Sequence, residues 1–139
     1  MKPRPIRALA AALLLSAALA GCDRNDGKAP AAGDFAGDLN ALGTEPFWGV
    51  AIRADHLTLS RPGEDDIQGA NAGPKIDGGS ATWTVSGGAK PFTLTVTKAD
   101  CSDQMSDRHY PYKAFLTLDE RTIAGCAATP EMLASKPAP

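Results

Sequence analysis

Residues 81–97, ATWTVSGGAKPFTLTVT, decide the fold, because two runs of alternating apolar and polar residues flank a turn. In each run every second residue is apolar, and threonines fill most of the positions between. Successive side chains of a strand point to opposite faces, so this period of two predicts two half-buried strands. The intervening Gly87–Pro91 segment has the composition of a hairpin connection. The stretch therefore predicts an antiparallel hairpin.

The same period recurs on both sides of this hairpin, in residues 47–52, 56–60 and 113–118, and a further run covers 122–126. The breaks between the runs are short, and residues 61–80, rich in glycine, predict one irregular strand near Ile67 or Ile76. We expect an all-β antiparallel meander of six to eight strands. A sheet this small must protect its edges, which favours closure into a barrel. The predicted inward side chains are Trp48, Val50, Ile52, Leu57, Leu59, Ala81, Trp83, Val85, Phe92, Leu94, Val96, Ala114, Leu116 and Leu118.

Length and composition limit the class of protein. The 139 residues suffice for one domain, and 14 glycines with 11 prolines argue against a helical bundle or a coiled coil. The net charge of −2 gives no electrostatic reason to expect nucleic-acid binding. A large multidomain enzyme is excluded by length.

The N-terminus has the pattern of an export signal. Three basic residues precede an apolar run, residues 8–20, which is too short to span a bilayer core of about 20 residues. The run ends in Leu19-Ala20-Gly21-Cys22, which resembles the lipobox of bacterial lipoproteins; the alternative is an ordinary signal peptide. We expect residues 1–21 to be removed and Cys22 to be acylated, anchoring a protein of the cell envelope that faces the periplasm. Asp23 resembles the enterobacterial signal for inner-membrane retention.

The mature chain then divides into three parts. Residues 22–42 read as the lipidated cysteine and a flexible tether, residues 43–128 as the β-barrel domain, and residues 129–139 as a loose tail. The end of the tether, with Phe35, Leu39 and Leu42, could instead form a short helix or lie on the domain. Removing residues 1–21 takes away three basic residues, which leaves 11 basic against 16 acidic residues, or −5.

Acylation of Cys22 leaves Cys101 and Cys126. Disulfides persist outside the cytoplasm, so we expect these two to pair. The bond would close a loop of about 25 residues and stabilise the domain by roughly 3 kcal/mol in the chain-entropy model. The chain has no C-x-x-C motif, which argues against a metal or redox pair.

Two segments carry a family resemblance. Residues 43–48 read GTEPFW, and residues 101–114 read CSDQMSDRHYPYKA, followed by Gly125-Cys126-Ala127. Over residues 43–127 the chain resembles a family of bacterial envelope lipoproteins marked by G-x-E-P-F-W and C-x-D-x-M-S-x-x-x-Y-P-Y. That family is associated with META/HslJ-like domains and with domains similar to the membrane-bound inhibitor of C-type lysozyme. Asp107 departs from the glycine that the family commonly has there. The resemblance implies a group of proteins, not an activity.

The first motif allows a physical interpretation. We expect Gly43 to permit a tight turn and Pro46 to fix the start of the first strand. Trp48 would lie on the inward face and could plug one end of the barrel; alternatively it is a core residue whose N–H donates to the backbone. Glu45 is either part of a binding site at the barrel mouth or a solvated carboxylate.

The segment 101–112 holds the densest group of chemically capable side chains, and loops on rigid scaffolds concentrate binding residues. Asp103, Ser106 and His109 could form a triad, although no nucleophile elbow is present. Met105, His109 and His56 could hold copper. The third alternative is a loop that covers the barrel end. The candidate partner-binding residues are Glu45, Trp48, Met105, Ser106, Arg108, His109, Tyr110 and Tyr112.

The sequence thus predicts a lipid-anchored binding or protective module of the envelope that acts through residues 101–112, with Arg108, Tyr110 and Tyr112 as anchors. Its partner would be a lysozyme, another envelope protein or a wall fragment. One alternative is a structural or assembly lipoprotein without a ligand; others are a calycin-like small-molecule binder, a metal binder and a hydrolase. We assign no catalytic residue, cofactor or metal, and no nucleic-acid partner.

Overall fold

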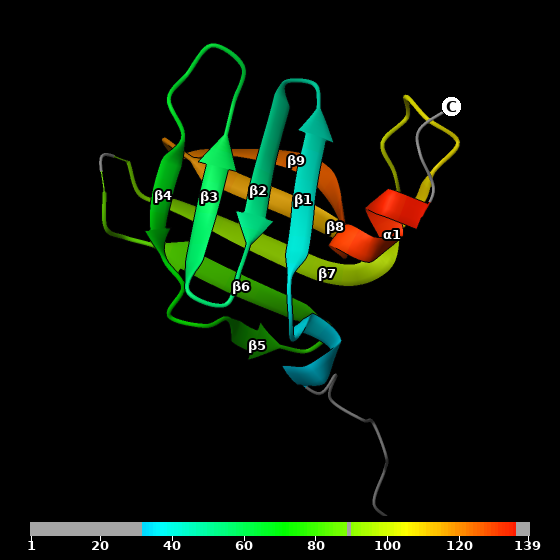
Figure 1. Cartoon of the computed structure of the whole chain (residues 1–139), viewed down its shortest axis with the longest axis horizontal. Coiled ribbons are helices and arrows are strands. Elements are labelled where there is room, and N and C mark those ends of the chain that lie inside the picture. The colour runs from blue at the N-terminus through cyan, green and yellow to red at the C-terminus, as the bar shows by residue number, and fades with distance from the viewer. Residues whose placement is uncertain (1–31, 89, 136–139) are drawn as a thin grey trace, which may run out of the picture.

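The protein is a nine-stranded antiparallel meander, which confirms the predicted all-β class (Figure 1). The computed structural model describes residues 32–88 and 90–135. Spatial order along the sheet is β4-β3-β2-β1-β9-β8-β7-β6-β5. The elements are η1 (Ala32–Phe35), β1 (Leu39–Thr44), β2 (Phe47–Ile52), β3 (His56–Ser60), β4 (Ile67–Ala70), β5 (Lys75–Asp77), β6 (Ser80–Val85), β7 (Phe92–Ser102), β8 (His109–Leu118), β9 (Arg121–Ala128) and α1 (Pro130–Ser135).

The hairpin predicted from residues 81–97 forms as β6 and β7. Trp83 lies opposite Leu94 on the buried face. On the other face, threonine hydroxyls meet across the strands, with 3.1 Å between the Oγ1 atoms of Thr82 and Thr95. The alternation in the sequence therefore separates an apolar face from a hydroxyl-rich face, as half-buried strands require.

The sheet does not close into the predicted barrel, and it has nine strands instead of six to eight. Its end strands β4 and β5 do not pair; they have only four and three residues. Instead, β4 packs on β6, where a Cβ added to Gly69 would lie 2.1 Å from Cγ1 of Val85. In Figure 1, strands β1–β4 cross in front of the strands of the β6–β9 half. Packing of the two halves face to face buries the apolar side without edge-to-edge closure.

Side chains from both halves form one hydrophobic core between them. Every predicted inward residue is buried, and the largest fully buried side chains include Ile52, Leu57, Leu59, Leu94 and Leu116. The described residues include no buried polar or charged side chain. The interior is therefore lined by apolar side chains.

The domain begins before the predicted boundary at residue 43. Phe35 is buried, its ring centroid lies 5.7 Å from that of Tyr112, and the Tyr112 hydroxyl donates to the carbonyl of Asp34 at 2.9 Å. Residues 39–44 form a complete strand, so Phe35, Leu39 and Leu42 lie on the domain, as one of the two alternatives predicted.

Part of the predicted tail forms α1. The predicted signal peptide and Cys22 lie outside the described residues. None of the helices within 32–135 is long and apolar enough to cross a bilayer.

Candidate functional site: a fork between β1 and β9

Strands β1 and β9 separate at one end of their contact. β1 pairs with β2 along its whole length, but it pairs with β9 only from Leu42, opposite Cys126, to Asn40, opposite Ala128. Continuing this register would place Gly43 opposite Gly125 and Thr44 opposite Ala124, and neither pair forms. We call this divergence of the two strands, bounded by residues 43–44 and 124–125, the fork.

The indole of Trp48 fills the inner side of the fork. A Cβ added to Gly43 would lie 2.0 Å from Nε1 of Trp48, and one added to Gly125 would lie 2.7 Å from its Cζ2. Both positions therefore require glycine, because any larger residue would collide with the Trp48 indole. Gly43 is a strand residue without a positive φ, so its predicted role in a tight turn is wrong. Trp48 is a core residue, as one alternative held, but its N–H finds no hydrogen-bond partner among the described residues.

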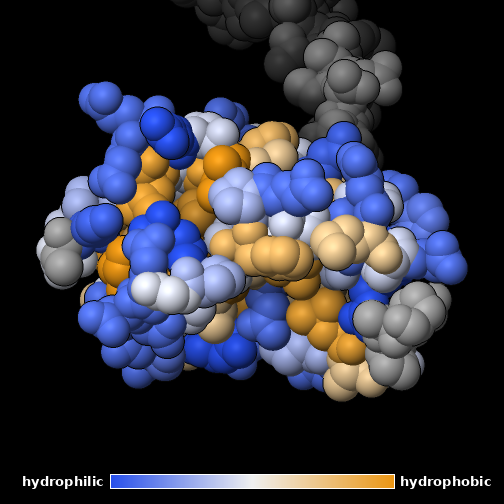
Figure 2. Space-filling model, turned by 90° about the horizontal axis from the view of Figure 1, so that it is seen from above, coloured by the Kyte–Doolittle hydropathy of each residue, from blue (hydrophilic) through white to orange (hydrophobic). Residues whose placement is uncertain are grey.

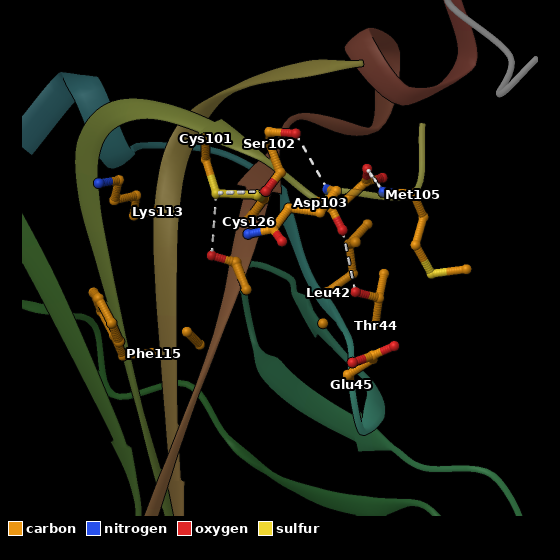
Figure 3. A pocket seen from close by; sticks show the side chains of 14 residues that line it. Leu42, Thr44, Glu45, Cys101, Ser102, Asp103, Met105, Lys113, Phe115 and Cys126 are labelled. Atoms are coloured by element: carbon orange, nitrogen blue, oxygen red, sulfur yellow. Dashed lines mark hydrogen bonds between the residues drawn. A yellow bond between two sulfur atoms is a disulfide. The ribbon is translucent and has the colours of Figure 1, made fainter. Parts of the chain in front are cut away.

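A pocket of about 480 Å³ opens on the outer side of the fork. Figure 3 shows Lys113 and Phe115 along one side, Thr44 and Glu45 along the other, and Met105 at the end formed by the β7–β8 loop. This volume lies within the range of about 300–1,000 Å³ that is usual for ligand pockets. The pocket therefore combines an apolar surface with two carboxylates, those of Glu45 and Asp103, and the ammonium group of Lys113.

A bend in β7 builds one wall of this pocket. Pro111 in β8 has no N–H to donate, and two β7 residues, Ala99 and Asp100, stand opposite it as a bulge between the pairs at Lys98 and Cys101. Figure 1 shows β7 curving strongly at this end. The bend brings Cys101 to a Cα–Cα distance of 5.7 Å from Cys126, and the predicted disulfide forms. The bond joins β7 to β9 across β8.

Asp103 organises the loop that follows, residues 103–108. Its carboxylate accepts hydrogen bonds from the N–H groups of Met105 at 3.0 Å and Ser106 at 2.8 Å, and from the hydroxyls of Ser106 at 2.9 Å and Tyr110 at 2.8 Å. Its carbonyl accepts from the hydroxyl of Thr44 at 3.2 Å, which ties the loop to the fork. Four donors to one carboxylate give the loop a defined shape without help from a ligand.

These hydrogen bonds make the loop sensitive to acid. Desolvation raises the pKa of Asp103, but the donors of Ser106, Tyr110 and Met105 outweigh it and lower the pKa to about 2. The pKa of Tyr110 is raised, first by burial and then by its bond to the Asp103 carboxylate. A carboxylate whose pKa is lowered on folding stabilises the protein above its unfolded pKa and loses this contribution as the pH falls toward the folded value.

We therefore expect the unfolding free energy of the wild-type protein to fall by about 1 kcal/mol between about pH 4 and pH 2 as Asp103 is protonated. This value already allows for solvent screening, because the carboxylate is only half-buried. Urea unfolding at several pH values measures this loss. Asp103→Asn should remove that part of the pH dependence, while Asp107→Asn, an exposed neighbour, should keep it. Equal pH profiles for wild type and Asp103→Asn would contradict the assignment.

The three predicted anchors are engaged within the protein. Tyr110 is 5% exposed and bonded to Asp103. The guanidinium of Arg108 lies 6.0 Å from the centre of the Tyr110 ring and donates to the carbonyl of Leu133 at 3.0 Å. Tyr112 holds η1, as described above. These side chains therefore support the loop and the domain start, which is the alternative in which the loop packs on its own fold.

Glu45 and Met105 are the predicted residues that the structure brings together at the pocket. Ser106 lies in the same loop with its hydroxyl directed to Asp103. His109 is exposed and pairs with Asp100, with 3.2 Å between Nδ1 and Oδ2. In a triad the histidine lies between serine and carboxylate, whereas here Ser106 meets the carboxylate directly and His109 turns to another residue.

The proposed copper ligands are also separated by their contacts. His56 begins β3 and pairs with Asp55, while His109 pairs with Asp100 in β7. Within residues 32–88 and 90–135, no three side chains of histidine, cysteine, aspartate or glutamate are grouped so as to hold a metal ion.

Sequence reasoning missed Lys113, Phe115 and the fork itself. Phe115 had a detectable signal, because it is an aromatic residue at an outward position of a run whose other outward residues are Lys113 and Thr117. On the face shown in Figure 2, hydrophobic residues lie in separate groups between hydrophilic ones, and the exposed large apolar side chains of the described residues are Phe47, Met105, Phe115 and Met132. The pocket, not a broad apolar surface, is therefore the candidate site.

Comparisons of the chain with protein-family models, with curated proteins and with solved structures found no match.

Proposed function

We propose that the protein is a lipid-anchored binding module of the bacterial envelope, which takes a polypeptide partner into the pocket of the fork. The observation that carries this proposal is the pair Glu45 and Lys113. Both are exposed, they stand on opposite sides of one pocket, and neither forms an ion pair with another residue of the described ranges. Unpaired charges beside the apolar Met105 and Phe115 suit a ligand that carries both polar and apolar groups.

The orientation of the domain supports this use. The described chain enters at η1, at the end of the molecule opposite the β1–β2 turn that carries Glu45 (Figure 1). With the predicted acyl anchor at Cys22, the tether would join the domain at the end opposite this turn. Asp23 favours the inner membrane for the anchor. A partner in the periplasm could then reach the pocket without contacting lipid.

The charge of the mature chain favours a basic partner. Its net −5 would attract a cationic protein over distances near the Debye length of about 8 Å. A lysozyme, which is basic, is therefore the first partner to test, and an inhibitor of lysozyme is one form of the proposed function. Other envelope proteins form the second set of partners.

The test measures binding of a lysozyme, and of proteins from native envelopes, to the full chain held in detergent. Neutralising the pocket charges with Glu45→Gln and Lys113→Gln should weaken binding of the true partner by about tenfold, since each change removes a charge-assisted contact. The matched controls Lys75→Gln and Asp77→Asn alter exposed charges of β5 and should bind as wild type. Equal binding by pocket variants and controls would contradict the proposal.

The second candidate is a structural or assembly lipoprotein without a ligand. Its support is the inward engagement of Arg108 and Tyr110, which leaves the loop packed on its own fold. This candidate predicts that neither a lysozyme nor an envelope protein binds to the wild-type chain or to its pocket variants. The same binding measurement therefore separates the two candidates.

A further inference from the structure

We infer that Met105 is a reversible oxidation site, at which a peroxide converts the thioether to a sulfoxide and thereby weakens binding of the partner in the pocket. This inference rests on the proposed function, because Met105 lines the same pocket. It goes further by giving that site a regulation. Part of the apolar lining would be lost on exposure to peroxide and regained when the sulfoxide is reduced.

Met105 is the most accessible sulfur-bearing side chain of the described residues. It is 65% exposed, against 43% for Met132, while Cys101 and Cys126 are buried and already joined in the disulfide. Figure 3 shows the Met105 sulfur well apart from the two cysteine sulfurs. Unlike a thiol, whose reactivity depends on its pKa, a thioether has no proton to lose, so access to the oxidant decides its rate. Met105 should therefore react before Met132.

The reaction is a two-electron oxygen transfer. A lone pair of the Met105 sulfur attacks one oxygen of hydrogen peroxide, so that an S–O bond forms and the O–O bond breaks. The departing hydroxide takes the proton of the transferred oxygen and leaves as water, with the sulfur oxidised and the peroxide reduced. A methionine sulfoxide reductase reverses the change: the oxygen leaves as water and a dithiol is oxidised to a disulfide.

The loop that carries Met105 is held by bonds that this oxidation would not disturb. The N–H of Met105 donates to the Asp103 carboxylate at 3.0 Å, and the same carboxylate accepts from Ser106 and Tyr110. None of these bonds involves the thioether. Neither of the two hydrophobic clusters formed by the described residues includes the Met105 side chain. Oxidation should therefore leave the stability of the fold unchanged, whereas oxidation of a core methionine disrupts packing.

The effect of oxidation falls on the pocket instead. Met105 and Phe115 are the exposed large apolar side chains of its lining. A sulfoxide has a strong S–O dipole and an oxygen that accepts hydrogen bonds, so it would bind water where the thioether offered an apolar surface. A partner that buries an apolar group against Met105 would have to remove this water. We therefore expect the sulfoxide to weaken binding by about tenfold, the scale of one side chain's apolar contact.

The test treats the full chain in detergent with hydrogen peroxide, removes the peroxide, and follows the methionines by peptide mass spectrometry. Met105 should reach half-oxidation before Met132. Binding of a lysozyme, and of proteins from native envelopes, is then measured on treated and untreated protein. Treated wild type should bind about tenfold more weakly and regain its affinity after incubation with a methionine sulfoxide reductase. Its unfolding free energy, measured in urea, should not change.

Two variants assign the effect to one sulfur. Met105→Leu has an apolar side chain of similar size without sulfur, so its own affinity should be the same before and after peroxide. Met132→Leu is the matched control; it removes the methionine of α1, outside the pocket, and should respond to peroxide as wild type does. The third methionine, Met1, belongs to the predicted signal peptide and lies outside the described residues.

Each outcome decides. Loss of binding on oxidation of wild type and Met132→Leu, but not of Met105→Leu, supports the inference. Equal loss in Met105→Leu, unchanged binding by protein oxidised at Met105, or a fall in unfolding free energy overturns it. The proposed function still stands in these cases if binding depends on Glu45 and Lys113. If neither a lysozyme nor an envelope protein binds to untreated wild type, the proposed function is wrong and the regulation falls with it.

Discussion

Replacing Gly125 with alanine is expected to destabilise the protein by about 2–4 kcal/mol. The added Cβ would lie 2.1 Å from the carbonyl oxygen of Leu42 and 2.7 Å from Cζ2 of Trp48. The first of these neighbours is backbone and the second belongs to a buried indole, so neither can move without disturbing β1 or the core. Urea unfolding followed by circular dichroism measures the loss.

Gly49→Ala is the matched control, because Gly49 is also a strand glycine but the nearest atom to its added Cβ is a backbone oxygen at 3.8 Å. We expect its unfolding free energy to stay within about 0.5 kcal/mol of wild type. If Gly125→Ala were as stable as Gly49→Ala, the close approach of Trp48 and β1 at the fork would be wrong, and with it the geometry of the candidate site.

Removing the disulfide is the second change with a large expected effect. Cys101→Ala with Cys126→Ala should lower the unfolding free energy by about 3 kcal/mol, because the bond closes a loop of about 25 residues. For a domain of about 100 residues this corresponds to a fall in Tm of roughly 12–20 °C. The bond also holds the bent end of β7 to β9, so the Asp103 loop should become more mobile when the bond is absent. Thermal unfolding and amide exchange of residues 103–108 measure the two effects.

A reducing agent provides the control for this prediction. It should lower the Tm of the wild-type protein to that of the double variant and leave the variant unchanged, because the variant has no Cys101–Cys126 bond to reduce. A double variant with the Tm of oxidised wild type would contradict the role of the bond in holding the domain together.

Local alternation made the strands and the core predictable from the sequence. Trp83 and Leu94 could be placed on a buried face because the period of two is a property of each strand alone. Closure could not be predicted in the same way, since it depends on how β4 and β5 meet across the sheet. The short lengths of these strands, and the contact of Gly69 with Val85, leave the sheet open.

The candidate site was predictable only in part, because it too depends on contacts between separate elements of the fold. The motif around Asp103 indicated a loop of chemical importance, and the structure places Glu45 and Met105 at a pocket beside it. Sequence alone could not show that Tyr110 and Arg108 donate hydrogen bonds to Asp103 and Leu133, because these contacts join residues of separate elements. Nor could it show that Gly43 and Gly125, 82 positions apart, leave space for one indole.

The most direct test of the open fork is amide hydrogen exchange along β9, measured residue by residue by NMR on the full chain in detergent. We expect slow exchange at the amides that pair with β8 or with β1 at residues 126–128, and fast exchange at alternate amides of residues 121–124 that face the fork. Uniformly slow exchange along β9 would show that β1 and β9 remain paired, and would contradict the site on which the proposed function depends.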